Sequence, residues 1–259
     1  MQKFKSVITG ASQGIGAELA YEMSRRGSDL LLVARSRDKL EKVAEACRKL
    51  GASQVQISVQ DLSRVESWDV VVKEAQSFGV NVLINNAGYG LWGEFESQDL
   101  EALHQNMRLN MDAIVTLTHR LIPQLKASQP SYVLNVSSTT AYQALPTFAV
   151  YAASKSFILS WSRAIHHELK RQGVSVTVLV PGATDTGFID RAGLQHAAQA
   201  AKKVSMTAQA VASIGISGML QGKCEVVPGF INKLSAQAIP FLPKHLIEKA
   251  ASSIYNKGK

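Results

Sequence analysis

The chain alternates short apolar runs with longer stretches in which apolar residues recur at the spacing of an α-helix. The run "LLLVA" is apolar at every position, which is typical of a strand buried on both faces of a parallel sheet. This alternation requires crossover connections, so it predicts an α/β fold with a doubly wound, mostly parallel sheet of about seven strands. We expect the strands at residues 3–9, 30–34, 55–59, 80–84, 132–136, 174–180 and 224–227.

No internal repeat or low-complexity linker interrupts this pattern, so we expect one domain over residues 1–228 and a helical tail over residues 229–259. Residues 183–206 have few strand signals and should form a substrate loop with short helices. The tail holds five lysines and one glutamate, and one helical face carries Leu242, Leu246, Ile247, Ala250 and Ile254. Four roles stay open for it: packing on the protein's own body, a lid on the substrate pocket, an oligomer contact, or a basic amphipathic segment on a membrane surface.

Composition sets limits on location. Hydrophobic residues make up 46% and charged residues 19% of the chain, which is ordinary for a soluble globular protein. No apolar run has the ~18 residues of a membrane-spanning helix, and the first strand begins too close to Met1 to leave room for a signal peptide. Cys47 and Cys224 have no metal-ligand or redox spacing, so we expect free thiols, no metal site and a cytoplasmic protein.

The net charge of +8 raises the question of an anionic partner. Nucleic acid is disfavoured, because the chain has no block of Lys and Arg and no basic-aromatic pattern. An ordinary solvated basic surface and the attraction of a polyanionic cofactor are the two remaining interpretations.

The stretch "TGASQGIG", residues 9–16, lies where the first strand should meet the first helix. Its glycines at 10, 14 and 16 allow a tight turn, close approach to a phosphate, and packing of the helix on the sheet. The helix N-terminus would then offer free N–H groups and its positive dipole end to a pyrophosphate. The alternative is a glycine-rich turn without a ligand, and the spacing differs from the G-x-G-x-x-G dinucleotide motif.

A second stretch, "YAASK", places Tyr151 and Lys155 one helical turn apart, with Ser138 thirteen residues before the tyrosine. A Tyr/Lys pair at this spacing is common on surface helices and by itself indicates no function. Together with "TGASQGIG" and with "NNAG" at 85–88, in this order and after these strands, it resembles the short-chain dehydrogenase/reductase family. The resemblance runs from residue 3 to about residue 228 and implies a Rossmann-type fold and a nicotinamide-dependent oxidoreductase.

The resemblance also implies the catalytic roles. Tyr151 would be the general acid/base, and a neighbouring ammonium, Lys155, would lower the phenol pKa from its usual value near ~10. Lys155 would also hydrogen-bond the nicotinamide ribose, Ser138 would hold the substrate oxygen, and Asn110 would anchor a water relay to the lysine. Asn110 could instead be a polar residue satisfied inside its helix, and Ser137 is a neighbour that the thirteen-residue spacing disfavours.

The same resemblance assigns a cofactor-binding surface at the carboxyl ends of the strands. Thr184 stands where aliphatic residues are common in the family, so only a backbone contact is expected there. The assigned residues are Gly10, Ser12, Gln13, Gly14, Ile15, Gly16, Arg35, Ser36, Asp61, Leu62, Asn86, Ala87, Gly88, Tyr151, Lys155, Pro181, Gly182, Thr184 and Thr186.

The end of the second strand favours NADP(H) over NAD(H). An NAD enzyme of this fold would carry an acid there to bond the ribose 2′-hydroxyl. This chain reads "ARSR" at 34–37, where Arg35 can bond a 2′-phosphate through a charge-assisted fork and Ser36 can donate beside it. Gln13 is neutral at a position where some NADP enzymes of the family have a second base.

We therefore expect an NADP(H)-dependent oxidoreductase that transfers a hydride between nicotinamide and a carbonyl or secondary alcohol. Apolar residues at 89–95, at Tyr142, Leu145 and Phe148, and at 188–194 predict a hydrophobic or amphipathic substrate, although they could equally belong to the core. A homodimer or homotetramer is expected. The alternative is a catalytically silent sensor or scaffold that binds the dinucleotide, which the intact serine, tyrosine and lysine disfavour.

Overall fold

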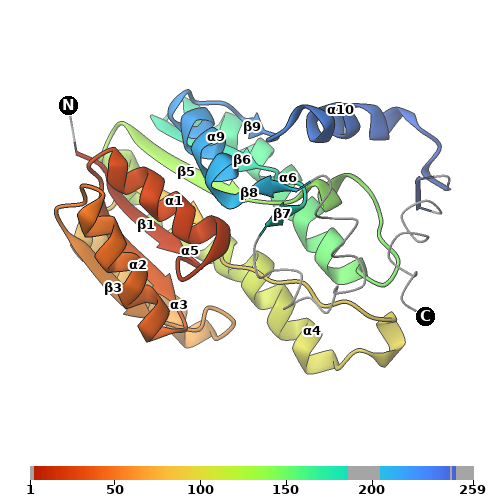
Figure 1. Ribbon diagram of the computed structural model, residues 1–259, viewed down its shortest axis with the longest axis horizontal. Helices are drawn as coiled ribbons and strands as arrows, with labels where there is room; N and C mark the ends of the chain where they lie inside the picture. Colours follow the sequence, from red (N-terminus) through yellow and green to blue (C-terminus); the bar gives the residue numbers. More distant parts are fainter. Residues whose placement is uncertain (1–2, 186–204, 246, 249–259) are drawn as a thin grey trace.

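A seven-stranded parallel sheet forms the centre of the molecule (Figure 1). The computed structural model describes residues 3–185, 205–245 and 247–248. The strand order β3-β2-β1-β4-β5-β6-β9 confirms the predicted α/β class, and every strand begins and ends within two residues of its expected position. The strands are β1 (Lys5–Thr9), β2 (Asp29–Ala34), β3 (Val55–Val59), β4 (Val82–Asn85), β5 (Ser131–Val136), β6 (Val174–Leu179) and β9 (Glu225–Val226).

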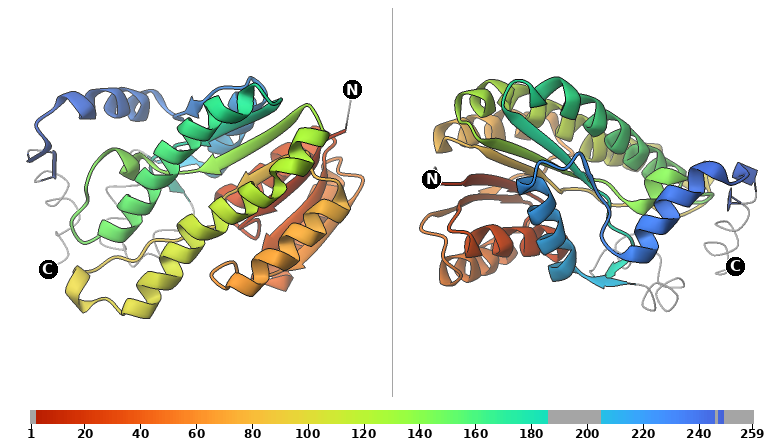
Figure 2. Two further views of the ribbon diagram at one scale, coloured as in Figure 1. Left: turned by 180° about the vertical axis from the view of Figure 1, so that it is seen from behind. Right: turned by 90° about the horizontal axis from the view of Figure 1, so that it is seen from above.

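Helices cover both faces of this sheet (Figure 2). Ile8 of β1 packs in one core cluster with residues of α1 (Gly14–Arg25) and α9 (Ala208–Leu220). Its neighbour Val7 packs in the other cluster with residues of α3 (Val65–Phe78) and α5 (Ala113–Ala127). Successive strand residues point to opposite faces, so a strand with a core on both sides is mostly apolar along its whole length. One face carries α1 (Gly14–Arg25), α2 (Arg37–Lys49) and α9 (Ala208–Leu220), and the other α3 (Val65–Phe78), α5 (Ala113–Ala127) and α6 (Ala149–Lys170).

The strand order reverses at β1, which lies between β2 and β4. The chain first builds outward from β1 to β3, then crosses back and builds outward on the other side from β4. In an open α/β sheet such a switch point leaves a crevice outside the carboxyl ends of the strands, and ligands bind there. The glycine stretch that follows β1 lies at this position.

The helical pattern over about residues 98–126 is interrupted in the structure. After α4 (Leu100–Met107), the segment Arg108–Asp112 is π-helical, and α5 follows. π-helical turns inside α-helices often occur at functional sites. The spacing of apolar residues does not reveal such a wider turn, so the sequence predicts one continuous helix.

The part of the chain after β6 carries shorter elements. β7 (Thr184–Asp185) pairs with β8 (Met206–Thr207) at the two ends of the expected substrate loop. Residues 186–204 lie outside the described residues, and with them Thr186 and the apolar positions 188–194. After β9, α10 (Phe230–Ala238) and the 3₁₀-helix η5 (Ile239–Phe241) extend outward at one end of the molecule (Figures 1 and 2). Within the described ranges no helix has the length and apolar character needed to cross a membrane.

Candidate active site

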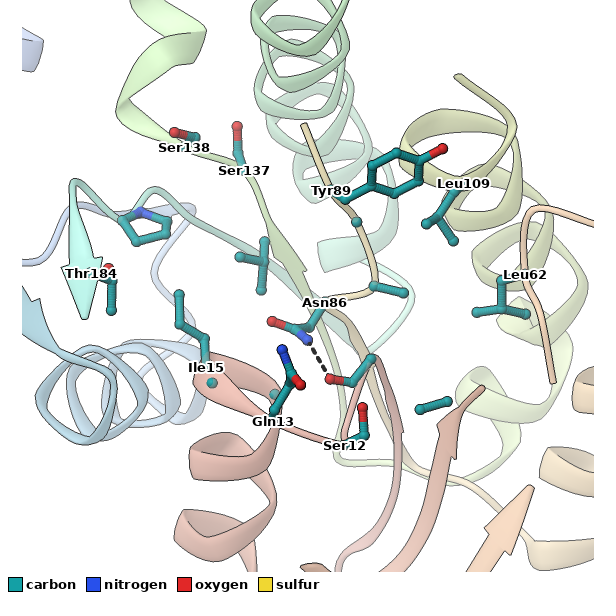
Figure 3. A pocket seen from close by; sticks show the side chains of 18 of the residues that line it. Ser12, Gln13, Ile15, Leu62, Asn86, Tyr89, Leu109, Ser137, Ser138 and Thr184 are labelled. Carbon is teal, nitrogen blue, oxygen red and sulfur yellow. Dashed lines mark hydrogen bonds between the residues drawn. The ribbon is translucent and has the colours of Figure 1, made fainter. Parts of the chain in front are cut away.

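A cavity of about 700 Å³ lies along the carboxyl ends of the strands. Figure 3 shows Leu62 and Leu109 at one end of it and Thr184 at the other, with Gln13 and Ile15 between them. The structure brings nearly all predicted site residues to its wall: Gly10, Ser12, Gln13, Gly14, Ile15, Gly16, Arg35, Ser36, Asp61, Leu62, Asn86, Ala87, Gly88, Ser138, Tyr151, Lys155, Pro181, Gly182 and Thr184. Of the others, Asn110 lies behind the wall and Thr186 is outside the described residues.

The turn after β1 packs against the "NNAG" segment that follows β4. Gly10 has a φ of 65°, a left-handed conformation that favours glycine. A side chain on Gly16 would collide with the Gly10 carbonyl oxygen and with the Asn86 amide. That amide donates to the carbonyl oxygens of Thr9 and Gly10, at 3.0 and 3.2 Å. Asn86 therefore fixes the shape of the glycine turn, which is a structural role beside any contact with a ligand.

The N-terminus of α1 opens into the cavity without a side-chain cap. Gln13 is the N-cap residue, its side chain makes no capping hydrogen bond, and the first turn holds no acidic residue. The first N–H groups of a helix have no partner within the helix, and the dipole makes this end positive. Gly14, Ile15 and Gly16 carry these groups and line the cavity, so an anion such as a pyrophosphate fits here.

Two basic side chains, Arg35 and Lys39, line the cavity near the end of β2. Arg35 is 4.0 Å from Oδ2 of Asp61, a loose and largely exposed ion pair. Ser36 is the N-cap of α2, and its side chain makes no capping bond. Lys39 also lines the cavity and donates from Nζ to Oε1 of Gln13 at 2.9 Å. We did not predict Lys39 from the sequence, although its i+3 relation to Ser36 places both on one side of the helix start.

α6 presents Tyr151 and Lys155 to the cavity. Lys155 is 4% exposed, its Nζ donates to the Val136 carbonyl oxygen at 3.0 Å, and it lies 5.6 Å from the centroid of the Tyr151 ring. Burial lowers the pKa of Lys155 to about 8, so most of it is still charged at neutral pH. The Tyr151 ring stacks on Phe148, with centroids 4.5 Å apart. The Lys155 ammonium therefore lies beside the Tyr151 ring.

The two neighbouring serines after β5 have different partners. Ser137 is buried, and its hydroxyl donates to the Lys155 carbonyl oxygen at 2.7 Å. Ser138 is only partly buried, and its hydroxyl oxygen accepts the Thr140 N–H at 3.2 Å as the N-cap of η3 (Thr139–Tyr142). The hydroxyl proton of Ser138 can therefore be donated to a ligand in the cavity, whereas that of Ser137 is engaged inside the protein.

Asn110 sits fully buried at the centre of the π-helical segment. Its side chain accepts the Tyr89 N–H at 3.2 Å and donates to the Tyr89 carbonyl oxygen at 2.9 Å and to Ser154 Oγ at 3.3 Å. A Cβ on Gly88 would lie 2.9 Å from Asn110 Oδ1 and 3.4 Å from Lys155 Nζ. Asn110 thus adjoins the same glycine as the lysine, and the water relay between them stays a prediction.

The predicted apolar substrate wall is only partly correct. Phe148 and Tyr89 line the cavity, but Tyr142 and Leu145 do not. The Tyr142 hydroxyl donates to Oε1 of Glu225 at 2.6 Å. The pKa of Tyr142 is raised, mainly because the side chain is buried and secondly because of this hydrogen bond. Leu145 is a buried core residue. The Tyr142 contact joins η3 to β9, whose residues are far apart in the sequence, so no local sequence pattern predicts it.

These features define a class of protein, a doubly wound α/β protein whose switch-point cavity suits a dinucleotide. The family model described as short chain dehydrogenase matches residues 5–197. The chain belongs to the short-chain dehydrogenase family, and the resemblance seen in the sequence is confirmed.

Individual relatives support this assignment. The chain is 36% identical to an 11-beta-hydroxysteroid dehydrogenase-like protein 4A of Arabidopsis thaliana, and 29% identical to the Mus musculus 17-beta-hydroxysteroid dehydrogenase type 3. Each match covers 70% of this chain but only 61% and 60% of the relative's length. A solved short-chain dehydrogenase from Sphingobium yanoikuyae in complex with NADPH is 27% identical, with a TM-score of 0.83 over 94% of this chain and 95% of that one.

Proposed function

We propose that this protein is an NADP(H)-dependent oxidoreductase that transfers a hydride between nicotinamide and a carbonyl or secondary alcohol. One observation carries the proposal. Tyr151 and the buried ammonium of Lys155 line the same cavity as the uncapped N-terminus of α1. An acid/base pair and an anion-binding helix end in one cavity are what a nicotinamide enzyme requires.

The chain's residues divide the chemistry among them. When bound, the nicotinamide supplies or accepts the hydride. In the reducing direction Tyr151 donates its proton to the substrate oxygen, and in the oxidising direction it accepts that proton. Ser138 donates its hydroxyl to the same oxygen and stabilises the charge that develops there. Lys155 holds a positive charge beside the phenol, which lowers the free energy of the phenolate.

The preference for NADP(H) rests on the basic group beside the N-terminus of α2. Solved structures of this fold hold NADPH in one case and NAD in another, so the fold alone does not choose. Arg35, Ser36 and Lys39 line the cavity together, and the sequence 34–37 lacks the acid that would bond a ribose 2′-hydroxyl. Two cations and an uncapped helix end fit a 2′-phosphate better than a hydroxyl.

We infer a hydrophobic or amphipathic substrate. Phe148 lines the cavity and stacks on the catalytic tyrosine, so it gives that part of the cavity an aromatic wall. The relatives' names also refer to such molecules, namely the hydroxysteroid dehydrogenases and a very-long-chain 3-oxoacyl-CoA reductase of Danio rerio. A steroid or long-chain acyl carbonyl is therefore the first class to test.

The test follows NADPH oxidation at the nicotinamide absorbance against ketosteroids, long-chain 3-oxoacyl thioesters and small polar ketones, with NADH as the competing cofactor. We expect turnover with the apolar carbonyls, a preference for NADPH, and loss of turnover in Tyr151→Phe. Tight NADPH binding without turnover on any carbonyl, or on the matching alcohols with NADP⁺, would support the silent sensor instead.

Two expectations from the sequence are proposals as well. A homodimer or homotetramer is supported by apolar surface on α6, where the exposed Phe157 ring stacks on Trp161 with centroids 6.4 Å apart. Light scattering of the purified protein tests it. A cytoplasmic location is tested by fractionating cells that express the full protein.

A further inference from the structure

α10 is oriented against the usual rule for a surface helix. Its buried side is small and polar: Ala236 is buried, and Asn232 bonds the Pro228 carbonyl oxygen. Its large apolar residues face outward, with Phe230 exposed to 81% and Ile231 to 69%. A surface helix normally turns its apolar stripe to the core. The apolar stripe of α10 faces away from the core, which indicates a contact with another molecule or surface.

The outward residues form one continuous face. At about 100° per residue, positions 230, 231, 234 and 238 fall within one side of the helix. Phe241, exposed to 88%, and Leu242 are further exposed apolar residues, in η5 and directly after it. We call Phe230, Ile231, Leu234, Phe241 and Leu242 the α10 face. Contiguous apolar surface of this kind marks an interaction site.

The segment that carries the α10 face is rich in lysine. Between residues 229 and 245 the charged side chains are Lys233 and Lys244, both exposed, and there is no carboxylate. The whole stretch 229–259 has five lysines and one glutamate, which is half of the chain's net charge. An apolar stripe in a segment with this excess of lysine is complementary to a bilayer surface with anionic headgroups.

A second copy of the chain fits this face less well. Most homodimer contacts are two-fold, so the same patch meets itself. Such a contact would bring Lys233 and Lys244 of one copy toward the same lysines of the other, and like charges across an interface oppose binding. An anionic lipid surface has no such conflict.

We propose that the α10 face docks the protein on the surface of an anionic lipid bilayer, with Phe230 and Phe241 inserted and the lysines at the headgroups. Docking would hold the cavity near the lipid. A Cβ on Gly182, which lines the cavity, would lie 2.5 Å from the Asn232 amide on the opposite side of α10. The inference concerns binding alone, so it stands or falls separately from the proposed reaction.

The test is co-sedimentation of the full chain with two kinds of vesicle, one of phosphatidylcholine and phosphatidylserine in equal parts and one of phosphatidylcholine alone. We expect binding to the first kind, weakened by salt, and little binding to the second. Replacing both Phe230 and Phe241 by Ser should lower the partition coefficient by roughly tenfold for each ring removed. Replacing Lys233 and Lys244 by Gln should lower it roughly fivefold for each charge and reduce the salt dependence.

Val65→Ser is the matched control, because Val65 is an exposed apolar residue of α3 and that helix lies far from α10 (Figure 1). It should leave vesicle binding unchanged. Equal partition of the wild-type and the double serine variant would overturn the proposal. So would sedimentation velocity, run without lipid, in which the serine variant alone falls from oligomer to monomer, because the face would then be a subunit contact.

Discussion

Removing the Arg35 side chain separates recognition of the 2′-phosphate from recognition of the rest of the dinucleotide. In the ligand-free protein Arg35 has only the 4.0 Å pair with Asp61, so Arg35→Ala should change folding stability little. A charge-assisted hydrogen bond contributes about 1.5–3 kcal/mol, which corresponds to roughly 10- to 150-fold in Kd. Because 66% of the Arg35 side chain is exposed and screened by salt, we expect the lower end, about tenfold.

The neighbouring arginine supplies a control of equal charge. Arg37 is 64% exposed and pairs with Glu41 at 3.8 Å, but it is not part of the cavity wall. Arg37→Ala therefore removes the same charge from the same surface without removing a ligand contact. Lys39→Gln should weaken NADPH binding only severalfold. The effect should be smaller than that of Arg35→Ala because Lys39 Nζ already donates one hydrogen bond to Gln13.

The assay is a titration of NADPH and of NADH into each variant at low and at high salt. Arg35→Ala should weaken NADPH about tenfold, leave NADH within twofold, and flatten the salt dependence of NADPH binding. Equal losses for the two cofactors would show that Arg35 shapes the site without reading the phosphate. Equal effects of the Arg35 and Arg37 substitutions would show that the preference for NADPH over NADH comes from general surface charge and not from a contact with Arg35.

Other substitutions test the catalytic side. Tyr151→Phe should lower kcat by about 10²–10⁴-fold while the NADPH Kd changes little, and near wild-type kcat would remove the tyrosine from the mechanism. Ser138→Ala should lower kcat without destabilising the protein, whereas Ser137→Ala should lower the melting temperature, because only Ser137 bonds a buried carbonyl oxygen. Gly88→Ala should reduce kcat by displacing Asn110, whose Oδ1 would lie 2.9 Å from the added Cβ, and unchanged kinetics would show that the reaction does not depend on the position of Asn110.

Local sequence patterns predicted most of the fold, because each strand of the seven-stranded sheet has an apolar or alternating pattern of its own, whereas the two-residue strands β7 and β8 are too short to show one. The glycine turn, Tyr151 and Lys155 were also found, since their functions depend on spacing within one turn or one helix. Lys39 was missed because its contact with Gln13 joins residues 26 positions apart.

The π-helical turn around Asn110 was missed for a related reason. It depends on a buried amide that bonds the backbone of Tyr89, a partner 21 residues away. The outward orientation of α10 could not be predicted either, because an apolar stripe in the sequence does not determine whether that side of the helix faces the core or the solvent. What the sequence lacks in each case is the identity of the tertiary partner.

The buried ammonium of Lys155 should lower the stability of the free protein at neutral pH. Its pKa of about 8 lies below the ordinary value near 10.5, so the unfolded chain binds more protons than the folded protein between these two values. Stability therefore rises with pH across that window, and below pH 8 the full penalty, about 3 kcal/mol, is present.

Lys155→Met should then stabilise the ligand-free protein by up to about 3 kcal/mol at pH 7, less the lost bond to Val136, while it abolishes turnover. The difference from wild type should shrink as the pH rises from 8 toward 10.5. Urea unfolding at pH 7 and pH 10 measures it, with Lys42→Met as the control, because Lys42 is exposed and its removal should have little effect at either pH. A stability difference between the two proteins that does not change with pH would contradict this reasoning. It would mean that burial does not destabilise the charged form of Lys155, because its ammonium is solvated or paired before any cofactor binds.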